Sequence, residues 1–111
     1  MKIYLIAGSA GSFDNEISWN VKACVVKEGA ENVAARLNAA AASVLEVAYR
    51  IPLPALRGWS KPEDYTAYVE ESKTYHEKIV GLLKDLPLPY PGFTDISGSI
   101  TYSVEELELE D

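Results

Sequence analysis

Two long stretches of helical periodicity, separated by prolines, are the feature of this sequence that most restricts its fold. In residues 29–51, apolar side chains recur every three or four positions, as at Val33, Leu37 and Val44. Pro52 ends this pattern, because proline lacks the backbone N–H that a helix interior needs. We therefore expect a long first helix that ends next to a proline-containing connector.

The second helical stretch covers residues 61–86 and carries its own start signal. Ser60 and Glu63 have the spacing of a capping box, and Pro62 suits the first helical turn. Its apolar stripe is rich in aromatic side chains, namely Tyr65, Tyr68 and Tyr75. Because only residues 52–59 separate the two helices, we expect them to pack antiparallel, with the tyrosines filling the space over an alanine-rich first helix.

Three shorter stretches predict β-strands. Residues 2–7 form a continuous apolar run, which predicts a strand buried on both faces and therefore central in its sheet. Residues 17–26 alternate between apolar and polar positions, which predicts a strand with one wet face. Residues 100–109 predict a third strand. Counted in steps of two, Leu107 falls on the opposite face of this strand from Tyr102. Either a bulge shifts the register there, or the strand ends early and the tail is loose.

The element order is thus ββααβ, and the predicted fold class is α+β. The simplest architecture is a three-stranded antiparallel sheet with two long antiparallel helices packed on one face, the third strand lying beside the first. The chain has 111 residues, of which 48% are hydrophobic, so we expect one domain spanning residues 1–111.

Charge is unevenly distributed along the chain. The formal net charge is −7, yet residues 1–55 are balanced, whereas the acidic C-terminal end, residues 103–111, holds acids and no base. This composition argues against direct nucleic-acid binding, which needs a lysine and arginine footprint. The acidic end either protects a strand edge from aggregation or docks a basic partner. A nucleic-acid mimic would also recruit acids of the second helix.

The residues that could carry chemistry do not form a recognisable constellation. The segment Gly8–Ser12 resembles a phosphate loop only in its glycines, because it leads into a strand and contains no lysine. A nucleophilic pair of Cys24 and His76 lacks a local orienting group. One cysteine and one histidine also exclude the usual Cys/His zinc sites. We therefore expect no metal, no cofactor and no enzymatic activity.

The expected location is the cytoplasm. The longest apolar runs are far shorter than the roughly 20 residues that a membrane span needs. The run before Gly8 is also too short for a signal-peptide core. No membrane association is expected.

Aromatic and acidic residues in exposed segments are the best candidates for contacts with a partner. Trp59 and Tyr90 lie in connectors, and tyrosine and tryptophan are enriched at binding hot spots. Glu105, Glu106 and Glu108 belong to the acidic end. We predict these five residues as protein-binding positions.

One segment resembles a known group of proteins. The strand Ile3–Ile6, the stretch Gly11–Trp19 and the region Gly98–Val104 resemble a family of small uncharacterised proteins encoded by phages and prophages. These typically have Gly-x-Tyr-Ser-Asp followed by a tryptophan, for which this chain has Gly11, Phe13 and Trp19. The resemblance implies a phage accessory protein in a bacterial host cell and transfers no catalytic residues.

The expected function is therefore a small acidic non-enzymatic protein-binding module. As a phage accessory protein it would bind a host protein or defence complex with a basic surface and inhibit it by occlusion, as anti-CRISPR proteins do. One alternative is a ligand-binding or enzymatic domain that uses the Gly8–Glu16 loop and His76. The other is a self-assembling structural protein, for instance a homodimer, that pairs exposed strand edges.

Overall fold

The structure is a computed structural model that describes residues 1–11, 16–54, 62–96 and 98–110. In chain order its elements are β1 (Lys2–Ala10), β2 (Ile17–Cys24), α1 (Lys27–Tyr49), α2 (Pro62–Leu83) and β3 (Thr101–Glu108). The predicted α+β class and the order ββααβ are confirmed. The predicted Ser60 cap lies outside the described residues.

The three strands form one sheet in the order β2-β1-β3, and both pairs are antiparallel. This confirms that the third strand lies beside the first, which is central. A bulge interrupts the pairing of β1 with β2 between Ile6 and Ala7.

One face of the sheet forms the core with α1. Ile6 and Tyr102 are buried on this face, and Ala34, Ala41 and Leu45 are buried on the helix. Alanines let the helix backbone approach the sheet closely, and those that do so are spaced along α1. Of the alanine-rich stretch 39–42, only Ala41 is buried, whereas Ala39, Ala40 and Ala42 are exposed.

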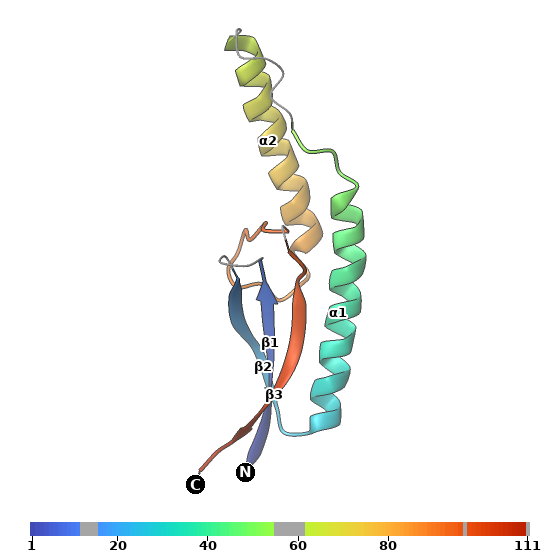
Figure 1. Cartoon of the computed structure of the whole chain (residues 1–111), viewed down its shortest axis with the longest axis vertical. Coiled ribbons are helices and arrows are strands. Elements are labelled where there is room, and N and C mark those ends of the chain that lie inside the picture. The colour runs from blue at the N-terminus through green and yellow to red at the C-terminus, as the bar shows by residue number, and fades with distance from the viewer. Residues whose placement is uncertain (12–15, 55–61, 97, 111) are drawn as a thin grey trace.

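The other face of the sheet is uncovered, which corrects the prediction that the first strand is buried on both sides. Ile3, Leu5 and Ala7 point away from the face that contains Ile6, and all three are only half-buried. β1 is central because it has a strand on each edge, but a helix covers only one of its faces (Figure 1).

The apolar side chains of β3 change from one face of the sheet to the other, and this needs neither a bulge nor an early end of the strand. The pairing of β1 with β3 continues without a shift from Lys2 opposite Glu108 to Ser9 opposite Thr101. Leu107 lies directly opposite Ile3 and so belongs to the uncovered face. The strand places apolar side chains on both faces in turn.

The two helices do not share the face of the sheet, and this part of the predicted architecture is wrong. α1 runs along the sheet, whereas α2 continues beyond its end (Figure 1), and the Cα atoms of α2 and of every strand stay more than 8 Å apart. The physical reason is width: three strands spaced about 4.8 Å apart present a surface about one helix wide. α1 occupies that surface alone.

The element ends differ from the predictions by a few residues. β1 continues to Ala10 through Gly8, where a Cβ atom would overlap the indole of Trp19. A glycine that suggests a loop in the sequence is therefore a strand residue under a large side chain. β2 ends at Cys24, which leaves Val25 exposed before α1 begins.

Candidate interaction surfaces

A pair of hydrogen bonds fixes the base of α2 to the sheet. After α2 ends, the carbonyl oxygen of Pro87 accepts a hydrogen bond from the Trp19 indole N–H at 3.0 Å and another from the Tyr102 hydroxyl at 2.8 Å. Phe93 is buried, with its ring 6.2 Å from that of Trp19 between centroids. The proline-rich loop, residues 87–93, is thereby attached to β2 and β3.

Tyr102 is the most constrained polar residue of this junction. Its backbone N–H donates to Asn38 Oδ1 at 2.7 Å, and its carbonyl accepts from Asn38 Nδ2 at 2.9 Å. The Asn38 side chain on α1 thus bonds to the outer edge of β3 as a neighbouring strand would. Burial also raises the pKa of the Tyr102 hydroxyl to about 12.

The most distinctive surface is the part of α2 that extends away from this junction. Ile79 and Leu83 are its only buried residues, and both belong to its C-terminal end. We call residues 62–78 the projecting segment; at about 1.5 Å per residue it is roughly 25 Å long. Figure 1 shows this segment extending well past the strands.

The projecting segment carries an apolar row without a buried member. Tyr65 is 63% exposed and Val69 is 48% exposed. Tyr68, Ser72 and Tyr75 follow at helical spacing and are half-buried. These five residues are called the tyrosine row below. Apolar and aromatic side chains in this arrangement are typical of a helix face that packs against another element.

The molecule is elongated, as the extension of α2 past the strands requires. It extends over 66 × 24 × 21 Å, with a radius of gyration of 18.2 Å, whereas a compact domain of this length has about 13 Å. Its accessible surface is 7808 Å², compared with about 6,100 Å² for a compact protein of this mass. About 1,700 Å² of surface is therefore exposed in excess.

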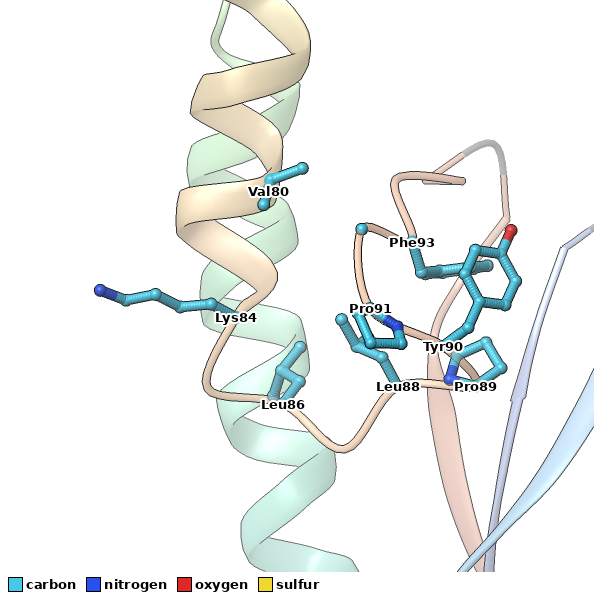
Figure 2. A pocket seen from close by; sticks show the side chains of 9 residues that line it. Val80, Lys84, Leu86, Leu88, Pro89, Tyr90, Pro91 and Phe93 are labelled. Atoms are coloured by element: carbon cyan, nitrogen blue, oxygen red, sulfur yellow. The ribbon is translucent and has the colours of Figure 1, made fainter.

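A hollow of about 520 Å³ lies between the C-terminal end of α2 and the proline-rich loop (Figure 2). Val80 and Leu86 line one side, and Pro89 and Tyr90 line the other. Figure 2 shows the Lys84 side chain directed away from the loop, so the hollow has mainly apolar walls. Such a surface can hold an apolar side chain of a partner but presents no set of convergent catalytic groups.

A second cavity lies where α1 and α2 meet, and we call it the junction cavity. Its volume is about 420 Å³, and Tyr49, Leu53, Tyr75 and Ile96 are among its lining residues. Leu53 is 73% exposed and Tyr49 is 58% exposed. The junction cavity therefore continues the tyrosine row as an apolar surface.

The four predicted contact residues that the structure describes do not form one surface. Tyr90 is 56% exposed and lines the hollow at the base of α2, whereas Trp59 lies outside the described residues. The C-terminal half of β3 carries Glu105, Glu106 and Glu108. This part of the strand lies near the chain ends, at the other end of the molecule from the projecting segment (Figure 1).

Two of the three predicted glutamates make ion pairs within the chain. Glu106 lies 3.5 Å from the Lys2 ammonium group, and Glu108 lies 3.4 Å from the N-terminal amine of Met1. All of these groups are exposed, so each pair contributes little to stability. Of the three, Glu105 alone has no ion pair among the described residues.

In the alternative enzymatic site and in the Cys24–His76 pair, His76 lies on an element that does not contact the elements of the other described residues. His76 is exposed on α2, and its ring contacts Tyr75 with centroids 6.2 Å apart. The Cα atoms of α2 stay more than 8 Å from those of β1, which contains Gly8, and from those of β2, which contains Cys24. Residues 12–15 of the loop lie outside the described part of the chain.

Two further features are absent from the described residues. No group of three or more histidine, cysteine, aspartate or glutamate side chains there is arranged to hold a metal ion. Neither α1 nor α2 combines the length and the apolar character of a membrane-crossing helix.

The projecting segment is the surface that sequence reasoning missed. The tyrosines were predicted to pack on α1, because the periodicity of a helix face does not reveal which element covers it. The width of the predicted sheet was the available signal, since three strands leave space for one helix. Comparison of the chain with protein-family models, curated proteins and solved structures finds no match.

Proposed function

We propose that this chain is a non-enzymatic protein-binding module and that the projecting segment of α2 is its contact surface. The observation that carries the proposal is that no side chain of α2 before Ile79 is buried, although the tyrosine row gives this length of the helix an apolar face.

The energetics of isolated helices support a partner for this segment. Most helical stability in proteins comes from packing of the apolar face rather than from helix propensity. The projecting segment has no buried side chain, and within the tyrosine row it is Tyr75, at the C-terminal end, that packs partly against the core. A partner that covers the tyrosine row would supply the missing burial.

The composition of the row also supports binding. Tyrosine buries a large apolar area, loses little side-chain entropy and keeps a hydroxyl for a polar contact. Tyr65, Tyr68 and Tyr75 lie on one side of the helix within three turns. This density of aromatic side chains is characteristic of contact surfaces.

The expectation of a phage accessory protein that inhibits a host defence complex stays a prediction. A partner with a basic surface fits the net charge of −7. If charge attraction contributes to binding, the partner is lost at high salt.

A matched pair of glutamate substitutions tests the proposed surface. Val69→Glu places a charge in the tyrosine row, whereas Ala67→Glu places the same charge on the opposite side of the same helix. Neither position is buried, so both variants should fold, and far-UV circular dichroism checks this.

Tagged wild-type protein and both variants are incubated with bacterial lysate and with a differently tagged copy of the chain, at low and high salt. We expect proteins that bind to the wild type and to Ala67→Glu but not to Val69→Glu. Equal binding by all three would refute the tyrosine row as the contact. If neither a lysate protein nor the second copy is retained, the proposed function is wrong.

A further inference from the structure

We infer that this chain forms a dimer in which β2 pairs with β2 of a second copy, antiparallel and edge to edge. The inference is independent of the proposed function, because it uses no residue of α2. Three features of the sheet lead to it: the edge that the fold leaves open, the direction of the backbone groups on that edge, and the order of side chains along β2.

The two edge strands of the sheet are protected to different degrees. On β3, Asn38 occupies both outward backbone groups of Tyr102, and the glutamates of its C-terminal half would repel a second β3 strand. On the other edge, β2 lies away from α1 (Figure 1) and carries one charged side chain, Lys22. β2 is therefore the edge on which a further strand can pair.

The hydrogen bonds at the β3 edge also show which backbone groups of β2 point outward. Because both backbone groups of Tyr102 point away from β1, its partner Gly8 directs its own groups toward β2. Gly8 pairs with Trp19, so the backbone groups of Trp19 point into the sheet. Those of the flanking Ser18 and Asn20 therefore point out of it. Among the described residues, no hydrogen bond reaches these outward groups.

The largest side chain of β2 leaves this edge accessible. The Trp19 indole lies over Gly8 of the central strand and donates to the Pro87 carbonyl at 3.0 Å, so it is directed toward β1 and away from the edge. Ser18 and Asn20, on either side of it, are exposed. A second strand can thus approach the backbone of β2 without displacing the indole.

The side chains along β2 are self-complementary about Trp19. A two-fold axis beside this residue places chemically matched side chains opposite one another, once on each side of the axis. The pairs are Glu16 with Lys22, Ile17 with Val21, and Ser18 with Asn20. Opposite charges, β-branched pairs and small hydrogen-bonding pairs are combinations that stabilise neighbouring antiparallel strands.

The same register satisfies the backbone. Ser18 of one copy faces Asn20 of the other, and because both direct N–H and C=O outward, they form hydrogen-bonded pairs on both sides of the axis. Trp19 faces its own copy as the non-hydrogen-bonded pair between them. The bulge of β2 lies beyond these central pairs, at Val21, which has no partner on β1.

The two charges of this register have no other partner in the fold. Glu16 and Lys22 are exposed, and neither makes an ion pair among the described residues. At about 3.3 Å per residue they lie about 20 Å apart along one chain, too far to pair within it. A shift of the axis by one residue in either direction separates them between the two copies as well. The charges therefore select the axis at Trp19.

Pairing of this kind joins the two sheets into one sheet of six strands, in the order β3-β1-β2-β2-β1-β3. Because the two β2 strands are antiparallel, both α1 helices lie on the same face and the two projecting segments point in opposite directions (Figure 1). The tyrosine rows stay exposed, so each dimer presents the proposed contact surface twice.

Sedimentation equilibrium of the purified full chain tests the inference, at low salt and over a concentration series. The series should reach about 1 mM, because a short strand pair gives a small interface and a weak dimer. We expect a reversible dimer for the wild type. Glu16→Lys and Lys22→Glu each place like charges opposite one another twice, so each should raise the dimer dissociation constant about fivefold or more.

The variant that combines both changes should dimerise like the wild type, because opposite charges again face one another. Overall charge predicts a different result, since Glu16→Lys makes the formal net charge of −7 less negative and by itself would favour association. Glu105→Lys is the matched control. It makes the same change of charge on β3, two strands away from the pairing edge, and should not raise the dissociation constant.

Two results of this series would count against the dimer. A wild-type chain that stays monomeric at every concentration overturns the inference. A combined variant that dimerises no better than Glu16→Lys or Lys22→Glu alone overturns the register about Trp19.

Ser18→Pro tests the backbone pairing. Proline removes the outward N–H of residue 18 and places its ring on the open edge, while the bonds of Ile17 and Trp19 to β1 are kept. We expect a folded monomer, with the fold checked by far-UV circular dichroism. A folded Ser18→Pro variant that dimerises like the wild type would contradict the pairing; if this variant does not fold, the charge variants decide.

Amide hydrogen exchange followed by nuclear magnetic resonance locates the interface in the unmodified chain. At a concentration where the dimer predominates, the N–H groups of Ser18 and Asn20 should exchange about tenfold more slowly than in Glu16→Lys at the same concentration. The N–H of Trp19 bonds to β1 in both states and should change less. A dimer that leaves Ser18 and Asn20 unprotected refutes β2 as the interface.

Failure of this inference is distinguishable from failure of the proposed function. Glu16→Lys should weaken the dimer and keep any captured lysate protein, whereas Val69→Glu should lose that protein and keep the dimer. A second copy held through β2 binds the wild type, Val69→Glu and Ala67→Glu alike, so only a protein lost on Val69→Glu supports the tyrosine row. A dimer that is lost on Val69→Glu but unaffected by Glu16→Lys refutes the β2 pairing.

Discussion

Replacement of Tyr102 by phenylalanine should lower the stability of the chain at neutral pH and raise it relative to the wild type in alkali. The hydroxyl of this buried side chain donates to the Pro87 carbonyl at 2.8 Å. Tyr102→Phe removes that hydrogen bond, but the carbonyl keeps its bond from Trp19. Because no buried acceptor is left unpaired, the expected loss is only about 1 kcal/mol in the free energy of unfolding.

The effect of pH follows from the raised pKa of this group. Tyr102 has a pKa of about 12 in the folded chain, because burial disfavours the phenolate, and 10.0 as its ordinary value. The unfolded chain therefore releases this proton first. Stability is unaffected below the unfolded pKa and is lost as the pH rises from 10.0 through about 12. The loss reaches at most about 2.7 kcal/mol, at about 1.36 kcal/mol per pH unit.

Urea unfolding at a series of pH values, followed by far-UV circular dichroism, measures the difference between the wild type and Tyr102→Phe. Lysines and the remaining tyrosines also titrate in alkali, but they are common to both proteins and cancel in the difference. The wild type should be more stable by about 1 kcal/mol near pH 8, and the two stabilities should become equal near pH 11.

Tyr90→Phe is the matched control for this experiment, because it removes the hydroxyl of an exposed tyrosine in the same proline-rich loop as Pro87. Its stability should stay close to that of the wild type throughout. If the difference between the wild type and Tyr102→Phe stays constant up to about pH 11.5, the assignment of a buried, raised-pKa phenol is refuted.

Three further substitutions test other contacts of the fold, each by urea unfolding. Gly8→Ala places a Cβ atom against the indole of Trp19 and should cost about 1–3 kcal/mol; an unchanged midpoint would contradict that contact. Asn38→Ala removes two hydrogen bonds to the backbone of β3 and should cost about 1–3 kcal/mol, whereas Asn32→Ala, on the exposed side of α1, should cost less than about 0.5 kcal/mol. Glu106→Gln breaks an exposed ion pair and should change stability by less than about 0.5 kcal/mol; a larger loss would mean that the acidic end of β3 is more than a solvated edge.

The elements of the fold were predictable because each has a local pattern. Apolar runs and alternation predicted the strands, and steps of three and four residues predicted the helices. Local patterns failed at Gly8, which suggests a loop but continues β1 because Trp19 packs over it. That contact joins two strands, and no pattern within one strand encodes it.

The arrangement of the helices was less predictable, because periodicity shows that a helix has an apolar face and not what covers it. The tyrosine row satisfies the pattern of a core helix, yet its members are exposed or half-buried. The candidate site was predictable only in part, since Tyr90 lines a hollow while Glu106 and Glu108 pair with groups of their own chain. The sequence shows that these residues are acidic, but it does not show which positively charged groups of the chain lie beside them in the fold.

The double acceptor at Pro87 has a consequence for how this chain can vary. The acceptor that attaches the proline-rich loop to the sheet is a main-chain oxygen, which every amino acid has. Substitution at position 87 therefore leaves the acceptor chemically intact. The donors are side chains, and only tryptophan at 19 and tyrosine at 102 supply this indole and this phenol. Among variants that keep the fold, we therefore expect residue 87 to change more freely than either donor.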